Sequence, residues 1–101
     1  MKPDVSMSFA HSLGRAEAKQ RLQRAVEMVQ TQYGSVVTLS EVEWSDDGVA
    51  FAARALAQTV RGRVDVDDTH VTVAAVLPLL LKPFASRIQG LVADQGVKLL
   101  R

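Results

Sequence analysis

The clearest hydrophobic pattern lies at the end of the chain. After an apolar run over residues 77–81, side chains at helical spacing form a stripe that is apolar except for a polar break at Gln95. The apolar positions are Phe84, Ile88, Leu91, Val92, Leu99 and Leu100. This spacing predicts a helix with one apolar face, which the rest of the chain must cover. Proline belongs in the first turn of a helix. Because of Pro83, the regular helix either begins near Lys82 or begins at Leu79 and is kinked.

A second helical stripe precedes residue 34. It consists of Ala18, Leu22, Ala25, Val26, Val29 and Tyr33, and its period predicts a helix with one buried face. Ser12 is the better N-cap residue, whereas Gly14 has Glu17 at the capping-box distance, so the helix is predicted to start at one of these two positions. Gly34 is expected to end the helix in the left-handed conformation, which glycine adopts without a Cβ clash.

Alternation of apolar and polar residues predicts five strands, over residues 5–9, 36–44, 49–55, 60–66 and 71–77. In the second strand the apolar parity changes, which predicts a β-bulge near Ser40 and Glu41. The turn after it carries Asp47-Gly48 at its tip, where this pair is expected to supply a positive φ. Both faces of the third strand are largely apolar, so this strand is predicted to be covered on both sides.

The predicted order of elements is strand, helix, four-stranded meander, helix. Short turns make neighbouring strands antiparallel, and both helices need the same face of the sheet. The sequence therefore predicts an α+β fold, a two-layer sandwich in β-α-β-β-β-β-α order. Its twisted antiparallel sheet would grip the C-terminal helix, as in helix-grip folds. With 101 residues, the chain is expected to form a single domain over residues 1–101.

Composition narrows the functions that are open to the chain. The sequence has no cysteine, which excludes disulfides, thiol catalysis and cysteine-based zinc sites. The first residues lack a signal-peptide core, and no apolar run approaches the ~20 residues of a membrane span, so a cytoplasmic protein is expected. The net charge is +1, but the predicted helices are basic and the strand region is acidic. This asymmetry serves solubility and helix–sheet attraction, or it presents a basic face to an anionic surface.

Residues that could ligate a metal gather in one place, at Asp65, Asp67, Asp68 and His70. An acidic turn between two strands explains them, so no metal site is predicted. The pair His11-Ser12 places a potential base beside a potential nucleophile. Neighbours in sequence rarely point at each other, however, and no motif supplies the acid or the oxyanion site that such chemistry needs.

The remaining polar and aromatic candidates are weaker. Glu41 and Glu43 share a strand face, as paired catalytic carboxylates could, but an exposed sheet face is the ordinary explanation. We therefore expect a non-enzymatic protein without catalytic residues or a cofactor. Nucleic-acid binding is not expected, because the basic residues are not interleaved with aromatic ones. Trp44, at a strand end, plugs the edge of the core or forms the edge of a pocket.

The apolar run before the C-terminal helix is longer than one helix face requires. Its surplus would lie exposed or line a pocket, and either arrangement is typical of a binding surface. The candidate docking surface, apolar with a basic rim, consists of Leu79, Leu80, Leu81, Lys82, Phe84 and Arg87.

Several segments, taken in order, resemble one bacterial family. They are residues 11–18, Trp44, residues 55–62, residues 71–78, residues 88–91 and residues 98–100. In this order they resemble the family called putative polyhydroxyalkanoic acid system proteins, over about residues 5–100. Ala57 and Pro83 depart from the family's pattern. The resemblance implies a role in polyhydroxyalkanoate metabolism, which builds polyester storage granules in the bacterial cytoplasm, and it supplies no catalytic residues.

Three functional hypotheses follow from the residues and the resemblance together. The first is an accessory protein that docks on the granule surface or on granule proteins through the candidate docking surface. The second is a carrier for an acyl ligand, which requires an internal void of several hundred Å³. The third is a hydrolase or thioesterase, which requires His11 or His70 to converge with other polar groups. A homodimer through Ala50, Ala52 and Leu56 is compatible with all three.

Overall fold

Every alternation of apolar and polar residues in the sequence forms a strand. The computed structural model describes residues 3–32, 34–35, 37–55 and 57–100. The strands are β1 (Val5–Ala10), β2 (Thr38–Ser45), β3 (Gly48–Ala55), β4 (Gln58–Val66) and β5 (His70–Val76). They form one antiparallel sheet in the order β1-β5-β4-β3-β2. The first strand therefore lies beside the last, and β2 forms the opposite edge.

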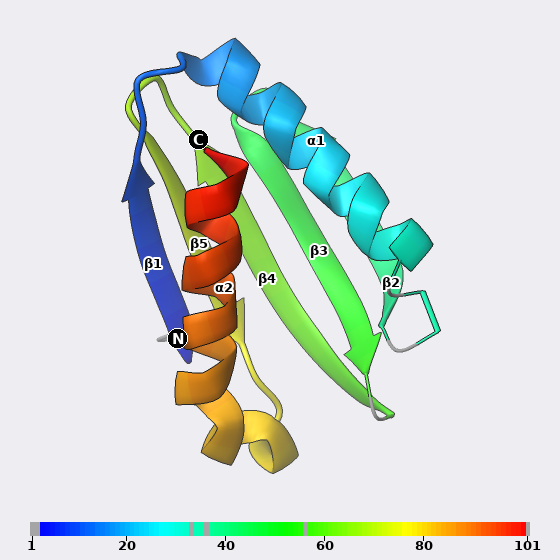
Figure 1. Ribbon diagram of the computed structural model, residues 1–101. Coiled ribbons are helices and arrows are strands. Elements are labelled where there is room, and N and C mark those ends of the chain that lie inside the picture. The colour runs from blue at the N-terminus through cyan, green and yellow to red at the C-terminus, as the bar shows by residue number, and fades with distance from the viewer. Residues whose placement is uncertain (1–2, 33, 36, 56, 101) are drawn as a thin grey trace.

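Two α-helices lie on one face of this sheet. The first, α1 (Arg15–Gln32), connects β1 to β2 and so crosses from one edge of the sheet to the other. The second, α2 (Ala85–Leu99), follows β5 after the 3₁₀ helix η1 (Leu79–Phe84). Figure 1 shows the twisted sheet behind both helices, with α2 on the side of β1 and α1 on the side of β3 and β2. The predicted α+β fold and its order of elements are confirmed.

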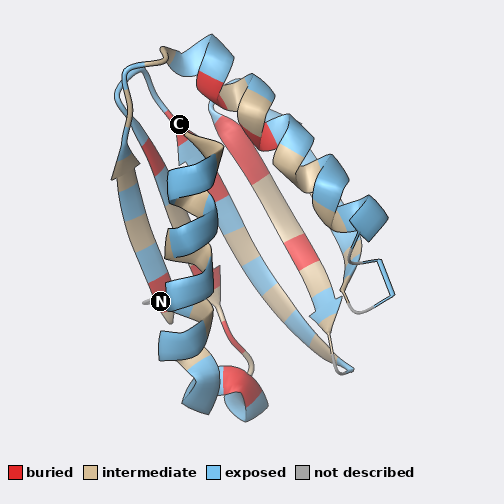
Figure 2. Ribbon diagram, in the orientation of Figure 1, coloured by how far each residue is buried: buried red, intermediate tan, exposed pale blue. Residues whose placement is uncertain are grey.

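The core consists of two clusters, and each helix is anchored in a different one. The first cluster joins two residues of α1 to four residues of the sheet: Ala18, Leu22, Val49, Val64, Val66 and Val71. The second joins the sheet to η1 and contains Val5, Ala75, Leu77 and Leu81, with Ala85 and Ile88 of α2 packed against it. Figure 2 shows the buried residues on the strands, on the inner side of α1 and in η1.

On the sheet face away from the helices, an ion pair lies over β3. On this face Ala52 is buried, and it pairs with Glu41 of β2 on one side and with Arg61 of β4 on the other. The Arg61 Nη1 lies 3.1 Å from the Glu41 Oε2, so the two side chains span Ala52. The predicted β-bulge is confirmed, because the β2–β3 register shifts between Leu39 and Glu41. The prediction that both faces of β3 are covered holds at Ala52, whose outer side is covered by the Glu41 and Arg61 side chains. Leu56, which belongs to the same prediction, lies outside the described residues.

The expectation that Gly48 supplies a positive φ is wrong. The described residues with positive φ are Gly14, at 81°, and Ala57, at 61°. Gly48 instead pairs with Ser45 at the start of β3. A Cβ at Gly48 would clash with the Val64 carbonyl oxygen of β4. Glycine is therefore needed here because two strands approach closely, which its sequence neighbours do not reveal.

The start of α1 is capped from a distant turn. The helix begins at Arg15, directly after Gly14, which agrees with one of the two predicted starts. The Arg15 backbone N–H donates to Asp68 Oδ1 at 3.1 Å, so a side chain between β4 and β5 satisfies this orphan donor. The left-handed conformation expected at Gly34 is wrong, because its φ is not positive. Tyr33 lies outside the described residues.

Pro83 shapes the entry into the C-terminal helix. The helical segment begins at Leu79, as one alternative predicts, but its first six residues form a 3₁₀ helix that contains Pro83. The regular α-helix begins only at Ala85. Proline has no N–H to donate and its ring disfavours an α-helical interior. The 3₁₀ segment thus takes the place of a kinked α-helix.

The turn between β4 and β5 is organised by the Asp67 carboxylate. Its Oδ1 accepts hydrogen bonds from the backbone N–H of Thr69 at 2.8 Å and from that of His70 at 2.6 Å. These donors hold the pKa of Asp67 below its ordinary value of 3.8, because they stabilise the ionised form. The Thr69 hydroxyl, 3.2 Å from the same oxygen, acts in the same direction.

We expect Asp67→Ala to lower stability at neutral pH and to weaken its pH dependence in acid. Because the folded-state pKa lies below 3.8, this stabilisation is present above the unfolded pKa and is lost as pH falls through the folded one. Urea unfolding at neutral pH and at about pH 3 measures the effect. Asp46→Ala, at the neighbouring hairpin tip, is the control. An Asp67→Ala variant that loses stability in acid as steeply as the wild type would contradict the assignment.

Candidate functional site

The surplus apolar residues after β5 form an exposed surface. Leu79, Leu80 and Phe84 are 83%, 63% and 50% exposed. Leu81, which the sequence placed in the same candidate surface, is instead buried in the second core cluster. We therefore leave Leu81 out and define the η1 surface as Leu79, Leu80 and Phe84 together with Lys82 and Arg87.

This surface is held in place by buried neighbours and by Asp4. Leu77 and Leu81 pack into the second core cluster on either side of Pro78. The Leu77 backbone N–H donates to Asp4 Oδ2 at 2.8 Å, and the Lys82 Nζ lies 4.0 Å from Asp4 Oδ1. The exposed side chains are therefore carried by an anchored segment, so a partner that binds them has little backbone to order.

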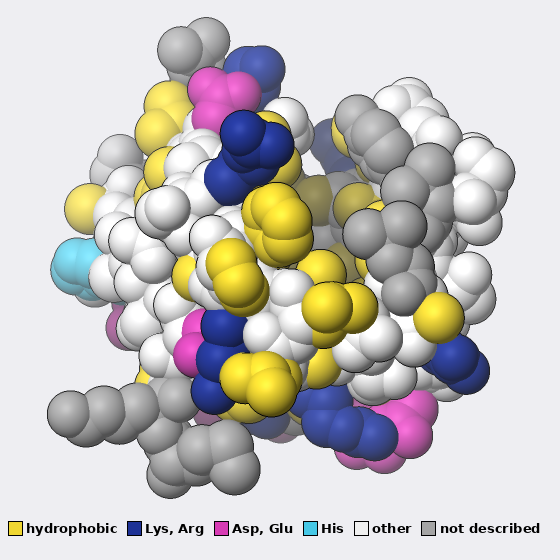
Figure 3. All heavy atoms as spheres, turned by 90° about the horizontal axis from the view of Figure 1, so that it is seen from below, with side chains coloured by type: hydrophobic (Ala, Val, Ile, Leu, Met, Phe, Trp, Pro, Cys, Tyr) yellow, Lys and Arg dark blue, Asp and Glu magenta, His cyan; other side chains and the backbone are white. Residues whose placement is uncertain are grey.

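Cations accompany the apolar side chains on this surface. Figure 3 looks at the end of the molecule where η1 lies and shows hydrophobic side chains beside Lys and Arg side chains. Arg87 is exposed, and within the described part of the chain it makes no ion pair. Apolar side chains flanked by cations are suited to an amphiphilic surface that carries negative charge.

Trp44 lies on the edge strand β2, opposite Val49. The Lys19 Nζ of α1 donates to the carbonyl of the adjacent residue, Ser45, at 2.8 Å, so this strand end lies beside the start of α1. Among the described residues, one surface hollow lies between α1 and α2 and another between β1 and α2, and Trp44 lines neither of them. Trp44 is therefore separate from the η1 surface and from the groove between α1 and α2.

A groove of about 800 Å³ separates the two helices. Its floor is formed by valines of β4 and β5, and its walls by apolar residues of both helices: Val64, Val71, Val73, Leu22, Ala25, Met28, Leu91, Val92 and Leu99. Figure 3 looks into its open end, where the surface is hollowed and hydrophobic side chains lie inside. The sequence periodicity identifies the apolar face of each helix, but not the distance between the helices, so the groove was not predicted.

Charged side chains line the rim of this groove. The Arg21 Nε lies 3.3 Å from Glu17 Oε1, and the Arg21 Nη1 donates to the Leu99 carbonyl at 3.3 Å across the groove. The Lys98 Nζ lies 3.3 Å from Asp94 Oδ2. Arg24 also lines the groove and has no ion-pair partner in the described ranges.

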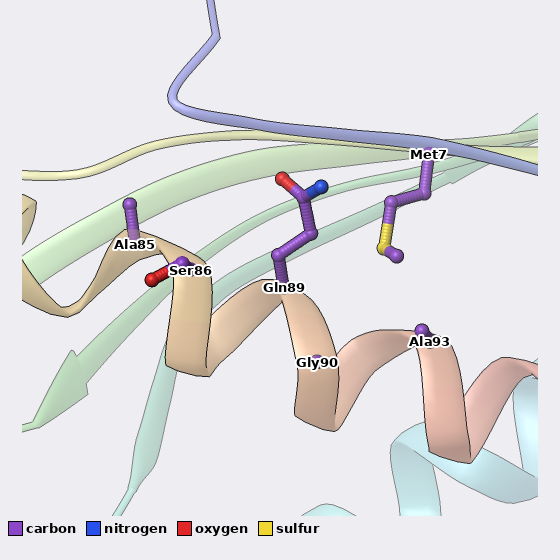
Figure 4. A pocket seen from close by; sticks show the side chains of 6 residues that line it. All are labelled: Met7, Ala85, Ser86, Gln89, Gly90 and Ala93. Carbon is purple, nitrogen blue, oxygen red and sulfur yellow. The ribbon is translucent and has the colours of Figure 1, made fainter.

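A second hollow, of about 530 Å³, lies between β1 and α2. It is lined by Met7 of β1 and by Ala85, Ser86, Gln89, Gly90 and Ala93 of α2. Figure 4 shows the Met7 and Gln89 side chains pointing into the space between strand and helix. Its polar side chains are Ser86 and Gln89, and its lining carries no charged side chain that could pair with an ionised ligand.

The polar candidates from the sequence serve the local structure. His11 Nδ1 accepts the Leu13 backbone N–H at 3.2 Å, so Nε2 carries the proton that it donates to the Asp67 carbonyl at 3.1 Å. His70 Nδ1 lies 2.8 Å from the Thr69 hydroxyl. Glu41 pairs with Arg61 on the far face of the sheet. The described residues hold no cluster of three or more His, Asp or Glu side chains that could bind a metal ion.

Comparison with known proteins identifies the family. No curated protein and no solved structure matches the chain, and the likeness to helix-grip folds therefore stays a prediction. Among the described residues, no helix is long and apolar enough to span a membrane. The family model described as putative polyhydroxyalkanoic acid system protein matches residues 5–100, which confirms the resemblance seen in the sequence. The chain belongs to this family of polyhydroxyalkanoic acid system proteins.

Proposed function

We propose that this protein is a non-enzymatic accessory protein of bacterial polyhydroxyalkanoate metabolism that docks on storage granules in the cytoplasm through the η1 surface. The exposure of Leu79 and Leu80 carries the proposal, because leucines so open to water gain most from contact with an apolar partner. Family membership supports the link to the polymer. A granule presents a hydrophobic polyester under an amphiphilic, partly anionic coat, which complements the apolar residues and cations of the η1 surface.

The expected affinity is that of reversible docking. Removing one exposed leucine or phenylalanine side chain from water contributes about 1.5–3 kcal/mol. Because Leu79, Leu80 and Phe84 are already partly buried, together they contribute about 3–6 kcal/mol before the costs of association, which corresponds to weak binding. Arg87 adds about 1 kcal/mol near an anionic surface, and Lys82 adds less because Asp4 lies beside it; salt screens this part.

The polar candidates support a role without catalysis. His11 and His70 are engaged in turn contacts, and Glu41 is paired with Arg61 on the far face of the sheet. General acid–base catalysis needs a titrating group within reach of a substrate pocket. The residues that line the groove between the helices include neither histidine.

We expect Leu80→Asp to reduce granule binding at least about tenfold, because it removes about 2 kcal/mol of apolar transfer and adds repulsion from an anionic coat. The measurement is co-sedimentation with native granules and with protein-stripped granules, across a salt series. Val97→Asp is the matched control, since Val97 is an exposed apolar residue near the other end of α2. It lies about 20 Å along the helix from Phe84 at 1.5 Å per residue.

The two granule preparations distinguish the partners. Saturable binding to both, weakened in Leu80→Asp and not in Val97→Asp, supports direct contact with the polymer surface. Binding to native granules alone indicates a granule protein as the partner. Absence of binding to either preparation, or equal loss in both variants, would refute docking through the η1 surface.

A further inference from the structure

We propose that the groove between α1 and α2 binds the acyl chain of a single-chain amphiphile with an anionic head group, and that Arg24 pairs with that head group. The groove uses residues other than the η1 surface. The inference therefore stands whether or not the protein docks on granules, and it is tested separately.

The size and lining of the groove suit an apolar chain. Its volume of about 800 Å³ lies within the range of about 300–1,000 Å³ that is typical of small-molecule sites. The floor is provided by Val64 and Val73, and the walls by Leu22, Ala25 and Val92. Binding sites of this type combine an apolar lining with a few polar groups that orient the ligand.

The groove has a narrow end and a wide end. At the narrow end the Arg21 Nη1 donates to the Leu99 carbonyl at 3.3 Å and so bridges the two helices. From there the helices diverge (Figure 1). Towards the wide end the groove residues Met28 and Leu91 are 48% and 63% exposed. Two opposing walls thus present apolar side chains to water, and an acyl chain between them would bury both.

The rim charge selects the head group. The Arg21 charge is balanced by Glu17, and the Lys98 charge by Asp94. Arg24 follows Arg21 by one turn of α1 and is the groove cation that has no ion-pair partner among the described residues. One unbalanced cation over an apolar groove complements a carboxylate or phosphate on an acyl chain, and guanidinium binds either group in a bidentate manner.

A helix from another protein fits this groove less well. With side chains an α-helix is about 10 Å wide, which is much wider than an extended acyl chain. Stable protein partners bury about 800 Å² on each side, which requires far more than two turns of one helix. A single acyl chain is much narrower and can lie along the full length of the groove.

The test is a titration of the ¹⁵N-labelled protein with decanoate below its micellar concentration, followed by amide chemical shifts. Decyltrimethylammonium, with the same chain length and the opposite charge, is the matched ligand. We expect saturable shifts at Ala25, Leu91 and Gln95, with decanoate bound at least about fivefold more tightly than the cationic ligand. Arg24→Glu should abolish or reverse this preference.

The control variant is Arg54→Glu. Arg54 is an exposed cation on β3 that does not line the groove. It should bind decanoate as the wild type does, and so should Leu80→Asp, which separates this site from granule docking. Shifts confined to η1, equal binding of both ligands by the wild type, or an unchanged preference in Arg24→Glu would overturn the proposal. Absence of decanoate binding would overturn it as well, even if granule docking is observed.

Discussion

Leu22→Ala is expected to lower the free energy of unfolding by about 2–5 kcal/mol, the range found for truncation of a buried leucine. Leu22 is 6% exposed and packs in the first core cluster. Ala18 and Leu22 are the buried residues of α1, and Ala18 has little side chain to contribute. The attachment of α1 to the sheet therefore depends strongly on this one side chain. A loss of this size is a large part of the about 5–15 kcal/mol that stabilises a typical domain.

Urea unfolding followed by circular dichroism measures this effect. Gln23→Ala is the control, because Gln23 is the exposed neighbour of Leu22 on the same helix; it should change stability by less than about 0.5 kcal/mol. The N-terminal half of α1 also has polar contacts, from Arg15 to Asp47 and from Lys19 to the Ser45 carbonyl. A loss below about 1 kcal/mol in Leu22→Ala would mean that these contacts, and not apolar packing, hold the helix.

Gly96→Val is expected to destabilise the protein by about 1–3 kcal/mol, the usual cost of overpacking. A Cβ at Gly96 would lie 2.6 Å from Cζ of Phe9 and 2.7 Å from its Cε1. The Phe9 ring thus points end-on at the α2 backbone, and glycine allows the helix to lie close to β1. Added methyl groups would push α2 outwards or turn the ring into the groove.

Gly90→Val is the matched control for this prediction. Gly90 lies in the same helix, and a Cβ added to it would meet no atom of another element within 4 Å. Valine should be neutral there or slightly stabilising, because glycine is the poorer helix former by a few tenths of a kcal/mol. Combining Phe9→Ala with Gly96→Val should cost less than the sum of the single changes, since the clash disappears. Equal destabilisation by Gly90→Val and Gly96→Val would show that a β-branched side chain anywhere in α2, and not the contact with Phe9, is responsible.

Local patterns in the sequence were sufficient for most of the fold. The alternation of apolar and polar residues predicted each strand, and the change of parity near Ser40 and Glu41 predicted the β-bulge. The spacing of Ala18, Leu22 and Val26 predicted α1 and its inner face. These features depend on neighbours within a few residues, so the sequence contains the information directly.

Other features depend on residues that are far apart in the chain. Gly48 is explained by Val64 of β4 and Gly96 by Phe9 of β1, which approach the two glycines from distant parts of the sequence. The sequence suggested a backbone role for Gly48, because a glycine after aspartate commonly occupies a turn. Its actual role is steric, and only the pairing of β3 with β4 reveals this.

The candidate sites also differ in how far the sequence could predict them. The sequence identified Leu79, Leu80 and Phe84 as surplus apolar residues, because a run of leucines exceeds what one helix face needs. It could not separate them from Leu81, since only the path of η1 over Val5 and Leu77 decides which leucine faces the core. The groove between α1 and α2 could not be predicted from the sequence. Periodicity shows which residues share a helix face, but the space between α1 and α2 depends on where two separate core clusters anchor each helix.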